Sequence, residues 1–340
     1  MKLKPLGEQR IVIIGASSGI GLATARRAAA AGAKVVLAAR NGLALDEATV
    51  AIRNRGGNAV SIAVDVTDEG ASEEIAARAT EAFGGFDTWV NDAAVTVLAP
   101  FEKLSLEEHR RVFDVGYFGM VQGSMTALEH LKERGGAIIN VGSILSDRAV
   151  PLQGAYSAMK AALLGFTDAL RMEIEMAGYP VSVTLVKPSA TDTPYVEHAR
   201  NKLGKPSSPP PPPSVLYDPE LSAKAICFAA EHPRRTLTVG GAGLMMTALA
   251  PLQPRLSDLV LEEMLDAEGQ TGDTPPASGA YDNLFDHRVD GRTRSNQDHP
   301  VRRQSLYLEA QMHPLATAAV VATAAGAAAL LFSRRAPKKD

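Results

Sequence analysis

Tyr156 and Lys160 have the spacing that acid–base chemistry on a helix requires. Residues four apart on a helix project from the same face, so we expect the Lys160 ammonium to lie near the Tyr156 phenol. A free phenol has a pKa of ~10, and a cation within about 4–6 Å favours its ionised form. A phenol whose pKa is lowered toward neutrality can donate a proton to a carbonyl oxygen or accept one from an alcohol.

An ordinary surface pair on a helix is the alternative interpretation, and two observations weigh against it. Of the seven tyrosines, only Tyr156 has a lysine four residues later. Ser143 lies thirteen residues before Tyr156 and follows the strand-like run 137–141, where a hydroxyl could hold a substrate oxygen. Ser143, Tyr156 and Lys160 are therefore the predicted catalytic residues.

A glycine-rich turn follows the apolar run 11–14, which reads as a buried parallel strand, and leads into an alanine-rich helix. Glycines permit a tight turn and let the backbone approach a pyrophosphate at the helix N-terminus, where free N–H groups and the helix dipole attract anions. The turn has a steric explanation by itself, but its place between strand and helix favours dinucleotide binding. The predicted cofactor contacts in the turn are Gly15, Ser17, Ser18, Gly19, Ile20 and Gly21.

The end of the next strand-like run, 34–38, indicates which cofactor binds. An acidic residue there would accept a hydrogen bond from the ribose 2′-hydroxyl of NAD, whereas an arginine can pair with the 2′-phosphate of NADP. Arg40 occupies this place. NADP(H) is therefore the preferred cofactor, and NAD(H) stays open. The alternative is that Arg40 is a solvated loop residue.

Helical and strand-like segments alternate through the first 250 residues. Helices are expected at 44–55, 72–83, 156–177 and 220–231, and further strands at 58–63, 87–91, 137–141, 181–186 and 236–239. This order predicts an α/β fold with a doubly wound parallel sheet of about seven strands, the Rossmann fold. The cofactor is then expected at the carboxyl ends of the strands.

Serine, tyrosine and lysine at this spacing, after a glycine-rich turn, resemble the classical type of the short-chain dehydrogenase/reductase family, from about Gln9 to Ala250. The resemblance implies hydride transfer between a nicotinamide and a carbonyl or secondary alcohol. Tyr156 would be the proton donor in reduction, Ser143 would bind the carbonyl oxygen, and Lys160 would lower the pKa of Tyr156 and hold the nicotinamide ribose. Besides Tyr156 and Lys160, the further cofactor contacts implied are Asp65, Val66, Asn91, Ala93, Pro188 and Thr193.

Four residues depart from the family's pattern. Ile14 replaces the threonine that usually precedes the first glycine, and Asp92 and Ala94 replace an asparagine and a glycine in the neighbouring segment. Gly116 replaces a fourth catalytic residue, an asparagine that orders a water linking the lysine to solvent. We expect the space beside Gly116 to admit water and turnover to persist at a reduced rate. An NADP-binding sensor or membrane scaffold with weak or no turnover is the alternative function.

The composition of the chain limits the classes of partner that it is expected to bind. A formal charge of -3 and a pI of about 6.2 give no basic field for nucleic acid. The single cysteine, Cys227, excludes an intrachain disulfide framework and a cysteine-rich metal site, and no metal is expected. Residues 1–10 lack an apolar run of signal-peptide length. The expected partners are a small, apolar carbonyl or alcohol substrate and a second copy of the chain, since the family usually pairs through two long central helices.

The chain is expected to divide into a dinucleotide-binding domain at 1–250 with a substrate loop at 189–218, an amphipathic helix and extended arm at 251–313, a candidate membrane-anchoring helix at 314–333 and a basic tail at 334–340. Five prolines at 209–213 favour a stiff polyproline II segment, as a lid or spacer or as the ligand of a proline-binding module. The predicted anchors of the arm are Asn283-Leu284-Phe285 and Leu306-Tyr307-Leu308. The helix that is expected to cover the substrate cleft or bind a partner carries Leu256, Leu259, Val260 and Met264.

The segment from Leu315 to Phe332 is uncharged for eighteen residues and precedes a basic terminus. At about 1.5 Å per residue it is near the lower limit for crossing a ~30 Å hydrocarbon core. We expect a membrane-associated protein whose catalytic domain faces the cytoplasm, held by a transmembrane helix or by a helix lying among the lipid headgroups. A soluble helix and a cytoplasmic protein are the alternative.

Overall fold

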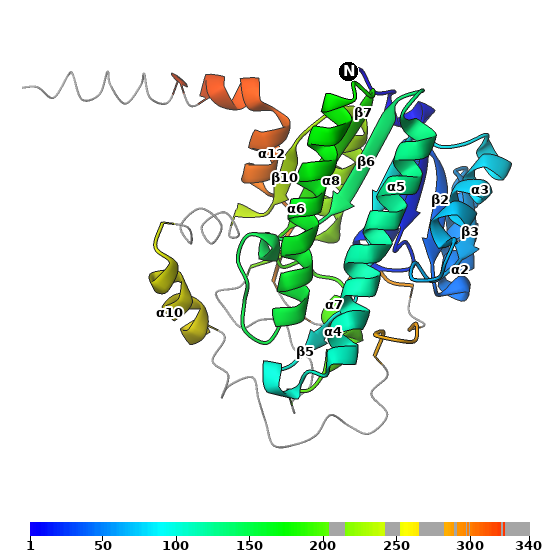
Figure 1. The fold of residues 1–340 in the computed structure, drawn as a ribbon. Helices are drawn as coiled ribbons and strands as arrows, with labels where there is room; N and C mark the ends of the chain where they lie inside the picture. Colours follow the sequence, from blue (N-terminus) through cyan, green and yellow to red (C-terminus); the bar gives the residue numbers. More distant parts are fainter. Residues whose placement is uncertain are drawn as a thin grey trace, which may run out of the picture.

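The computed structural model describes residues 1–203, 215–241, 252–264, 282–288, 291–296, 298, 300–320 and 322–323. A seven-stranded sheet runs through its centre (Figure 1). The strands are β1 (Arg10–Ile14), β2 (Lys34–Ala39), β3 (Asn58–Ala63), β4 (Thr88–Asn91), β6 (Gly136–Val141), β7 (Val181–Pro188) and β10 (Thr236–Val239). Their order is β10-β7-β6-β4-β1-β2-β3, and each neighbouring pair is parallel. The predicted parallel sheet of seven strands is confirmed.

Helices cover both faces of the sheet. The helices on one face are α1 (Gly19–Ala30), α2 (Gly42–Arg53) and α8 (Pro219–Glu231). Those on the other face are α3 (Ala71–Phe83), α5 (Gly119–Leu131) and α6 (Gly154–Met176), and α5 and α6 lie in front of the sheet in Figure 1. Two small sheets add to this core and pair β5 (Val97–Leu98) with β8 (Arg200–Asn201) and β9 (Leu216–Tyr217) with β11 (Val301–Arg302).

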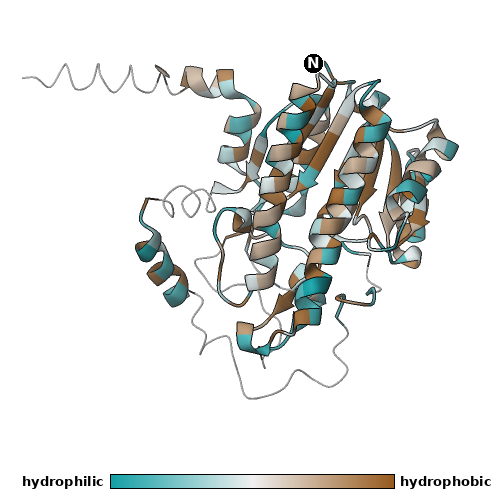
Figure 2. Ribbon diagram, viewed as in Figure 1, coloured by the Kyte–Doolittle hydropathy of each residue, from teal (hydrophilic) through white to brown (hydrophobic). Residues whose placement is uncertain are grey.

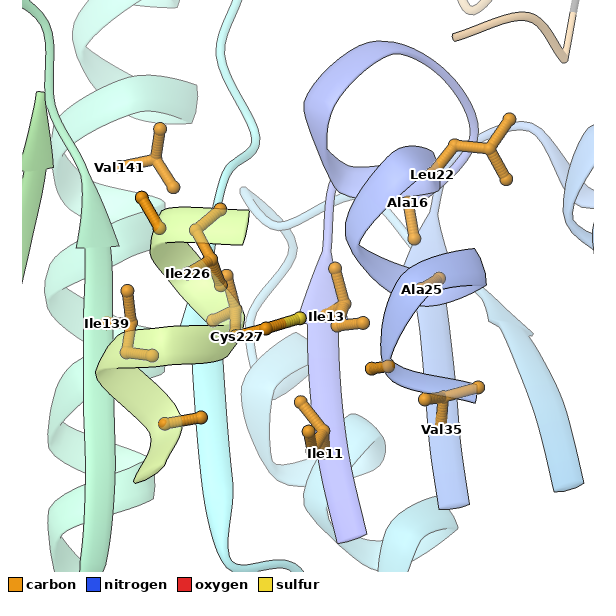
Figure 3. Packing of buried hydrophobic residues seen from close by; sticks show 14 of the residues in the cluster. Ile11, Ile13, Ala16, Leu22, Ala25, Val35, Ile139, Val141, Ile226 and Cys227 are labelled. Carbon is orange, nitrogen blue, oxygen red and sulfur yellow. The ribbon is translucent and has the colours of Figure 1, made fainter. Parts of the chain in front are cut away.

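The central strand β1 is buried from both sides, which explains why its sequence is apolar throughout. Side chains alternate along a strand, so Ile11 and Ile13 pack with α1 and α8, whereas Val12 and Ile14 pack in the opposite layer. Figure 3 shows Ile13 between these two helices, with the sulfur of buried Cys227 directed toward it. In Figure 2 the strands of the central sheet are mostly brown, because most of their residues are hydrophobic. Each such buried side chain stabilises the fold by about 1.5–3 kcal/mol.

A capping box begins the helical run that leads to the catalytic half. Ser105 Oγ accepts a hydrogen bond from the Glu108 N–H at 3.2 Å, and the Glu108 carboxylate accepts one from the Ser105 N–H at 2.8 Å. This capping box starts α4 (Leu106–Phe113). The run continues through a π-helical turn (Asp114–Phe118) into α5. Because π-helical turns are common at functional sites, the turn containing Gly116 is of interest below.

The C-terminal part of the chain returns to the main domain. Leu284 and Leu308 have no exposed surface, so both predicted anchors of the arm are confirmed. Leu308 belongs to α12 (Leu306–Met312), whose first turn is capped by the Ser305 hydroxyl. Another helix, α10 (Pro254–Met264), presents Leu261 as its buried residue.

Of the two roles predicted for the apolar face of α10, covering the substrate cleft is wrong, and binding a partner stays a prediction. Leu256, Leu259 and Val260 are 60%, 48% and 49% exposed, whereas Leu261 is buried. The spacing of the apolar residues allows either face, and only the neighbouring residues decide between them.

No helix among the described residues is long and apolar enough to cross a membrane. Of the expected membrane segment, residues 315–320 and 322–323 are described and helical, whereas 321 and 324–332 lie outside the described residues. Prolines 209–213 and the basic tail also lie outside them. The described part of the chain therefore does not support the expected transmembrane helix.

A buried ion pair joins β1 to the loop before β4. The Asp87 carboxylate accepts hydrogen bonds from Lys4 Nζ at 2.7 Å, from Arg10 Nε at 2.9 Å and from the Arg10 N–H at 2.9 Å. Burial alone would raise the pKa of Asp87, but the hydrogen bonds from Arg10 and Lys4 outweigh it and lower the pKa to about 2.

We predict that Asp87→Asn lowers the free energy of unfolding by about 1–2 kcal/mol at pH 7, after allowance for solvent screening. The stabilisation is present above about pH 4 and is lost as the pH falls toward about 2, because the native carboxylate is then protonated. Urea unfolding of both proteins across this range measures the difference. Asp68→Asn, at an exposed carboxylate, is the control. A difference that does not change with pH would contradict this assignment.

Candidate active site

A cavity of about 380 Å³ lies at the carboxyl ends of the central strands. Its walls come from the turn after β1, the loops after β2, β4 and β6, the first turns of α6 and the loop after β7. Parallel sheets of this topology bind their ligands at this edge. The predicted site residues on its walls are Gly15, Ser17, Ser18, Gly19, Ile20, Arg40, Asp65, Val66, Ala93, Ser143, Tyr156, Lys160, Pro188 and Thr193.

Gly21 and Asn91 are predicted cofactor contacts that do not line this cavity. A Cβ atom on Gly21 would lie 2.3 Å from the carbonyl oxygen of Gly15, so glycine is required for the turn to close. The Asn91 side chain donates to Asn140 Oδ1 at 2.8 Å and to Ser124 Oγ at 3.1 Å. Asn91 therefore joins β4 to β6 and α5 beneath the cavity floor.

The contact between β1 and the segment after β4 is made by the main chain. The Asp92 N–H donates to the Ile14 carbonyl at 3.1 Å. The resemblance assigns a contact between these segments to a threonine side chain where this chain has Ile14. The backbone bond joins the same two segments, so the floor is held together without that hydroxyl.

The glycine-rich turn has the shape that a pyrophosphate site requires. Gly15 has φ +86°, and a Cβ atom there would lie 2.8 Å from the Ala93 N, so the turn packs against the segment after β4. The turn presents the N-terminus of α1, whose first residues are Gly19 and Ile20, to the cavity. The Gly19 N–H donates to the carbonyl of Arg292 at 2.8 Å, and the dipole of α1 favours an anion beside it, so the turn fits the phosphates of a dinucleotide.

The three predicted catalytic residues meet at one wall of the cavity. Lys160 Nζ lies 5.5 Å from the centroid of the Tyr156 ring, which confirms that the two side chains are close. Lys160 Nζ also donates a 2.6 Å hydrogen bond to the carbonyl of Val141, the last residue of β6. Ser143 Oγ accepts from the Leu145 N–H at 3.1 Å, which leaves its own proton for donation.

The charge state of Tyr156 differs from the prediction. Burial raises the pKa of Tyr156 above its ordinary value, and the neighbouring hydroxyls of Tyr195 and Ser143 lower it only in part. Lys160 does not lower the pKa of the Tyr156 phenol to near neutral pH in the protein alone. Burial lowers the pKa of Lys160 itself, while the charge of Asp92 opposes that change. The expectation that the pKa of Tyr156 lies close to neutral pH is therefore wrong here, because desolvation of the phenol outweighs the attraction of one cation.

Asp92 adds a carboxyl group to this site where the family's pattern has an asparagine. Burial raises the pKa of Asp92, and the charge of Lys160 and a hydrogen bond from the Gly21 N–H lower it in part. Asp92 in turn favours the charged form of Lys160.

The expected water space beside Gly116 is filled by a side chain. A Cβ atom on Gly116 would lie 2.5 Å from Met159 Cε and 2.7 Å from Met159 Sδ. Met159 has no exposed surface and precedes Lys160 on α6. The expectation of a water beside Gly116 is wrong, because the neighbouring helix supplies a long thioether that occupies the volume.

Tyr195 and Thr96 are site residues that the sequence analysis missed. The Tyr195 ring lies 5.4 Å from the Tyr156 ring, centroid to centroid. Burial raises the pKa of Tyr195, and its hydroxyl faces Tyr156 and Thr96. The hydroxyls of Tyr195 and Thr96 make no hydrogen bond of normal geometry with the part of the chain that the structure describes. The position of Tyr195, two residues after Thr193 in the substrate loop, is the signal that could have identified it.

The groups around Arg40 also differ from the expectation of a free 2′-phosphate site. Arg40 Nη2 and Nη1 donate to the carbonyls of Asn283 and Phe285 at 2.6 and 2.9 Å. The Asp65 carboxylate, expected beside the adenine ring, accepts a 2.6 Å hydrogen bond from Arg111 Nη2. The arm that the sequence predicts as extended therefore lies against the cofactor half of the cavity.

We predict that Gly116→Asn lowers the free energy of unfolding by about 1–3 kcal/mol, because the added atoms overlap Met159 in a closed core. The double variant with Met159→Ala should be less destabilised than the sum of the two single losses, because the overlap is removed. Thermal unfolding of the two single variants and the double variant measures the coupling. Additive losses would show that Met159 does not fill this space.

Two solved structures are similar to this chain. One is a short chain dehydrogenase/reductase from Burkholderia phymatum in complex with NAD, with a TM-score of 0.66 and 23% identity, covering 82% of this chain and 99% of that structure. The other is an alcohol dehydrogenase from the archaeon Thermococcus sibiricus complexed with 5-hydroxy-NADP, with a TM-score of 0.60 and 26% identity, covering 68% and 95%. The first shows the fold alone.

Sequence relatives extend the comparison. The uncharacterized oxidoreductase YxnA of Bacillus subtilis is 43% identical over 324 residues, 95% of this chain and 90% of that protein, so the likeness extends beyond the dinucleotide-binding domain into the C-terminal arm. The cis-4-hydroxycyclohexanecarboxylate dehydrogenase of Sinomonas cyclohexanicum is 34% identical over 226 residues, 66% of this chain and 89% of that protein. The family model described as short chain dehydrogenase matches residues 9–204. With its parallel sheet, its glycine-rich turn and these matches, the chain belongs to the short-chain dehydrogenase/reductase family and is an NAD(P)-dependent oxidoreductase.

Proposed function

We propose that this enzyme is an NADP(H)-dependent oxidoreductase that interconverts an apolar carbonyl compound and the corresponding secondary alcohol. The observation that carries the proposal is the meeting of Ser143, Tyr156 and Lys160 on the cavity that the glycine-rich turn also lines. A nicotinamide cofactor supplies the hydride when it is bound, and the side chains of the protein handle the proton and the oxygen.

Tyr156 is the proposed general acid in reduction. Its burial keeps the phenol protonated at neutral pH, so the phenol holds a proton to donate as the substrate oxygen gains negative charge. Ser143 donates a hydrogen bond to the same oxygen, since its Oγ already accepts one from the backbone.

Lys160 is the proposed ligand of the nicotinamide ribose. The ammonium group has three N–H donors, and the Val141 carbonyl takes one of them. Its position beside the Tyr156 ring places the remaining donors at the same wall of the cavity.

Residues on the other walls of the cavity support the proposed cofactor, NADP(H), and the proposed class of substrate, an apolar carbonyl or alcohol. Ile20 and Thr193 would hold the phosphates and carboxamide, and Arg40 is the cation that favours NADP over NAD. Aliphatic residues that line the cavity are Ile144, Leu145, Val150, Val196 and Leu261. This lining supports an apolar substrate.

The alternative of a sensor or scaffold without useful turnover is not favoured by these findings. Ser143, Tyr156 and Lys160 lie together, and the space beside Gly116 is filled by the Met159 side chain of α6. Among the relatives, the Sinomonas protein is named as a dehydrogenase.

A homodimer is the proposed assembly. The helical run of α5 and the outer side of α6 carry large apolar side chains that are at least half exposed, namely Phe118, Met125, Met172 and Met176. Exposed apolar groups on two neighbouring long helices are typical of a surface that pairs with another copy.

We predict that Tyr156→Phe lowers kcat by about 10²–10⁴-fold and leaves NADPH binding unchanged, because only the transferable proton is removed. A cofactor-coupled screen of ketones and alcohols with both cofactors first identifies a substrate, and NADPH titration of the variant then measures binding. Tyr179→Phe is the matched control, since it removes a hydroxyl from an exposed tyrosine outside the cavity and should retain the activity. Wild-type turnover by Tyr156→Phe would contradict the assignment.

We also predict opposite pH dependences for the two directions of the reaction. Reduction needs the protonated phenol, so its kcat should stay level between about pH 6 and 9, below the raised pKa of Tyr156. Oxidation needs the phenolate, so its kcat should rise with pH over the same range. A reduction rate that falls between about pH 7 and 9 would mean that the phenol titrates near neutrality after all.

A further inference from the structure

A segment of the C-terminal arm crosses the cofactor half of the cavity. We call residues 282–288 and 291–296 the strap. Its backbone carbonyls accept hydrogen bonds from side chains of the dinucleotide-binding half: Arg40 donates to Asn283 and Phe285, Arg111 Nε donates to Leu284 at 2.9 Å, and Asn41 Nδ2 donates to Arg288.

The start of the strap is anchored by both packing and charge. Leu284 has no exposed surface and belongs to the core layer that contains Val66 and Val115. Asp282 pairs with Arg200 Nε at 2.9 Å and accepts a hydrogen bond from the Leu284 N–H at 2.9 Å. The same strap residues thus join the cofactor half to the loop after β7.

The end of the strap reaches the glycine-rich turn and the substrate loop. The carbonyl of Arg292 accepts a 2.8 Å hydrogen bond from the Gly19 N–H, the first residue of α1. Arg292 Nη2 pairs with Glu197 at 2.8 Å, and Ser295 Oγ donates to Asp192 at 2.5 Å. The strap therefore spans from Arg40 to the loop that carries Thr193.

The cavity persists with the strap in this position. Asn283, His287, Arg288 and Ser295 line the same 380 Å³ space as the glycine-rich turn. The strap therefore forms a wall of this space and leaves the space itself open. A wall built of polar side chains at a nucleotide site is expected to contact the nucleotide.

Two polar residues of this wall, Asn283 and Arg288, are candidates for contact with the nucleotide. The Asn283 side-chain oxygen is buried and has no hydrogen-bond partner among the described residues. Leaving a buried polar atom unsatisfied is costly, so such an atom indicates a binding partner. Arg288 also lines the cavity, and the Asn41 side chain donates to its backbone carbonyl.

We propose that the strap is the outer wall of the cofactor site, where the Asn283 amide hydrogen-bonds the adenosine and Arg288 joins Arg40 at the 2′-phosphate. The carbonyls of the strap hold the Arg40 guanidinium in place for this contact. The Arg288 part rests on the proposed NADP(H) preference, whereas the wall itself requires only a dinucleotide.

The wall is tested by loosening the strap in the full chain. Leu284→Ala removes a fully buried anchor of the strap, and Leu308→Ala removes the same side chain from α12, in the opposite core layer. Dissociation constants for NADPH and NADH are measured by fluorescence titration, and dissociation rates by stopped flow. We expect Leu284→Ala to weaken both cofactors and to speed their dissociation by about tenfold, with little change in Leu308→Ala.

Two results would contradict the proposal that the strap is a wall of the cofactor site. Tighter cofactor binding by Leu284→Ala would show that the strap competes with the nucleotide, and equal effects of the two leucine variants would show that the strap has no contact with it. Asp282→Asn, which removes the ion pair with Arg200 at a partly exposed position, replaces Leu284→Ala if that variant does not fold.

The two cofactor contacts are tested separately. Arg288→Gln should weaken NADPH by about tenfold and leave NADH unchanged, because only NADPH carries the 2′-phosphate. Asn283→Ala should weaken both cofactors alike. Arg303→Gln, at an exposed arginine of the tail, is the matched control. Equal weakening of NADPH and NADH by Arg288→Gln would overturn its assignment.

These measurements read binding and not turnover. A failure of the proposed catalytic roles would appear in the Tyr156→Phe kinetics and leave the binding results standing. A wild-type protein that binds NADH more tightly than NADPH would overturn the cofactor preference and the Arg288 contact, and the two leucine variants would still decide whether the strap is a wall of the site.

Discussion

The hydrogen bond from Lys160 Nζ to the Val141 carbonyl, 2.6 Å long, is the interaction on which the arrangement of the active site depends. Val141 ends β6 and Lys160 lies in the second turn of α6, so one bond sets the helix against the sheet edge. Ser143 follows β6 by two residues and Tyr156 precedes Lys160 by one helical turn, so both hydroxyls are positioned by the same contact. Burying an ammonium group is costly unless it is compensated, and here the Val141 carbonyl accepts one hydrogen bond while the charge of Asp92 favours the ammonium form.

The site shows how neighbouring positions compensate for one another. Gly116 lacks the side chain that the family carries there, and the volume is taken by Met159 from the next helix. Ile14 lacks a hydroxyl, and a backbone bond to Asp92 joins the two segments instead. Asp92 itself brings a carboxyl near Lys160 and changes the charge of the site. Each departure from the family's pattern is local, and the positions of Ser143, Tyr156 and Lys160 relative to the sheet are retained.

Much of the fold was predictable, because the strands of a parallel sheet are apolar on both faces and each is followed by its helix. The seven strands and the buried anchors Leu284 and Leu308 were all identified from sequence. The desolvation of Tyr156 was not predicted from sequence. Burial depends on residues from several elements, whereas the spacing along the helix identifies only the nearby charge of Lys160. The buried face of α10 and the position of the strap were also missed, because both depend on contacts between distant segments.

The bonds between Arg40 and the strap join residues 243 and 245 positions apart in the chain. Such a contact cannot form until residues 283–285 have been synthesised, whereas the first strands pair with near neighbours in sequence. The glycine-rich turn and β2 can thus be folded before the strap reaches Arg40. Under the role proposed for the strap, the outer wall is therefore the last part of the cofactor site to form.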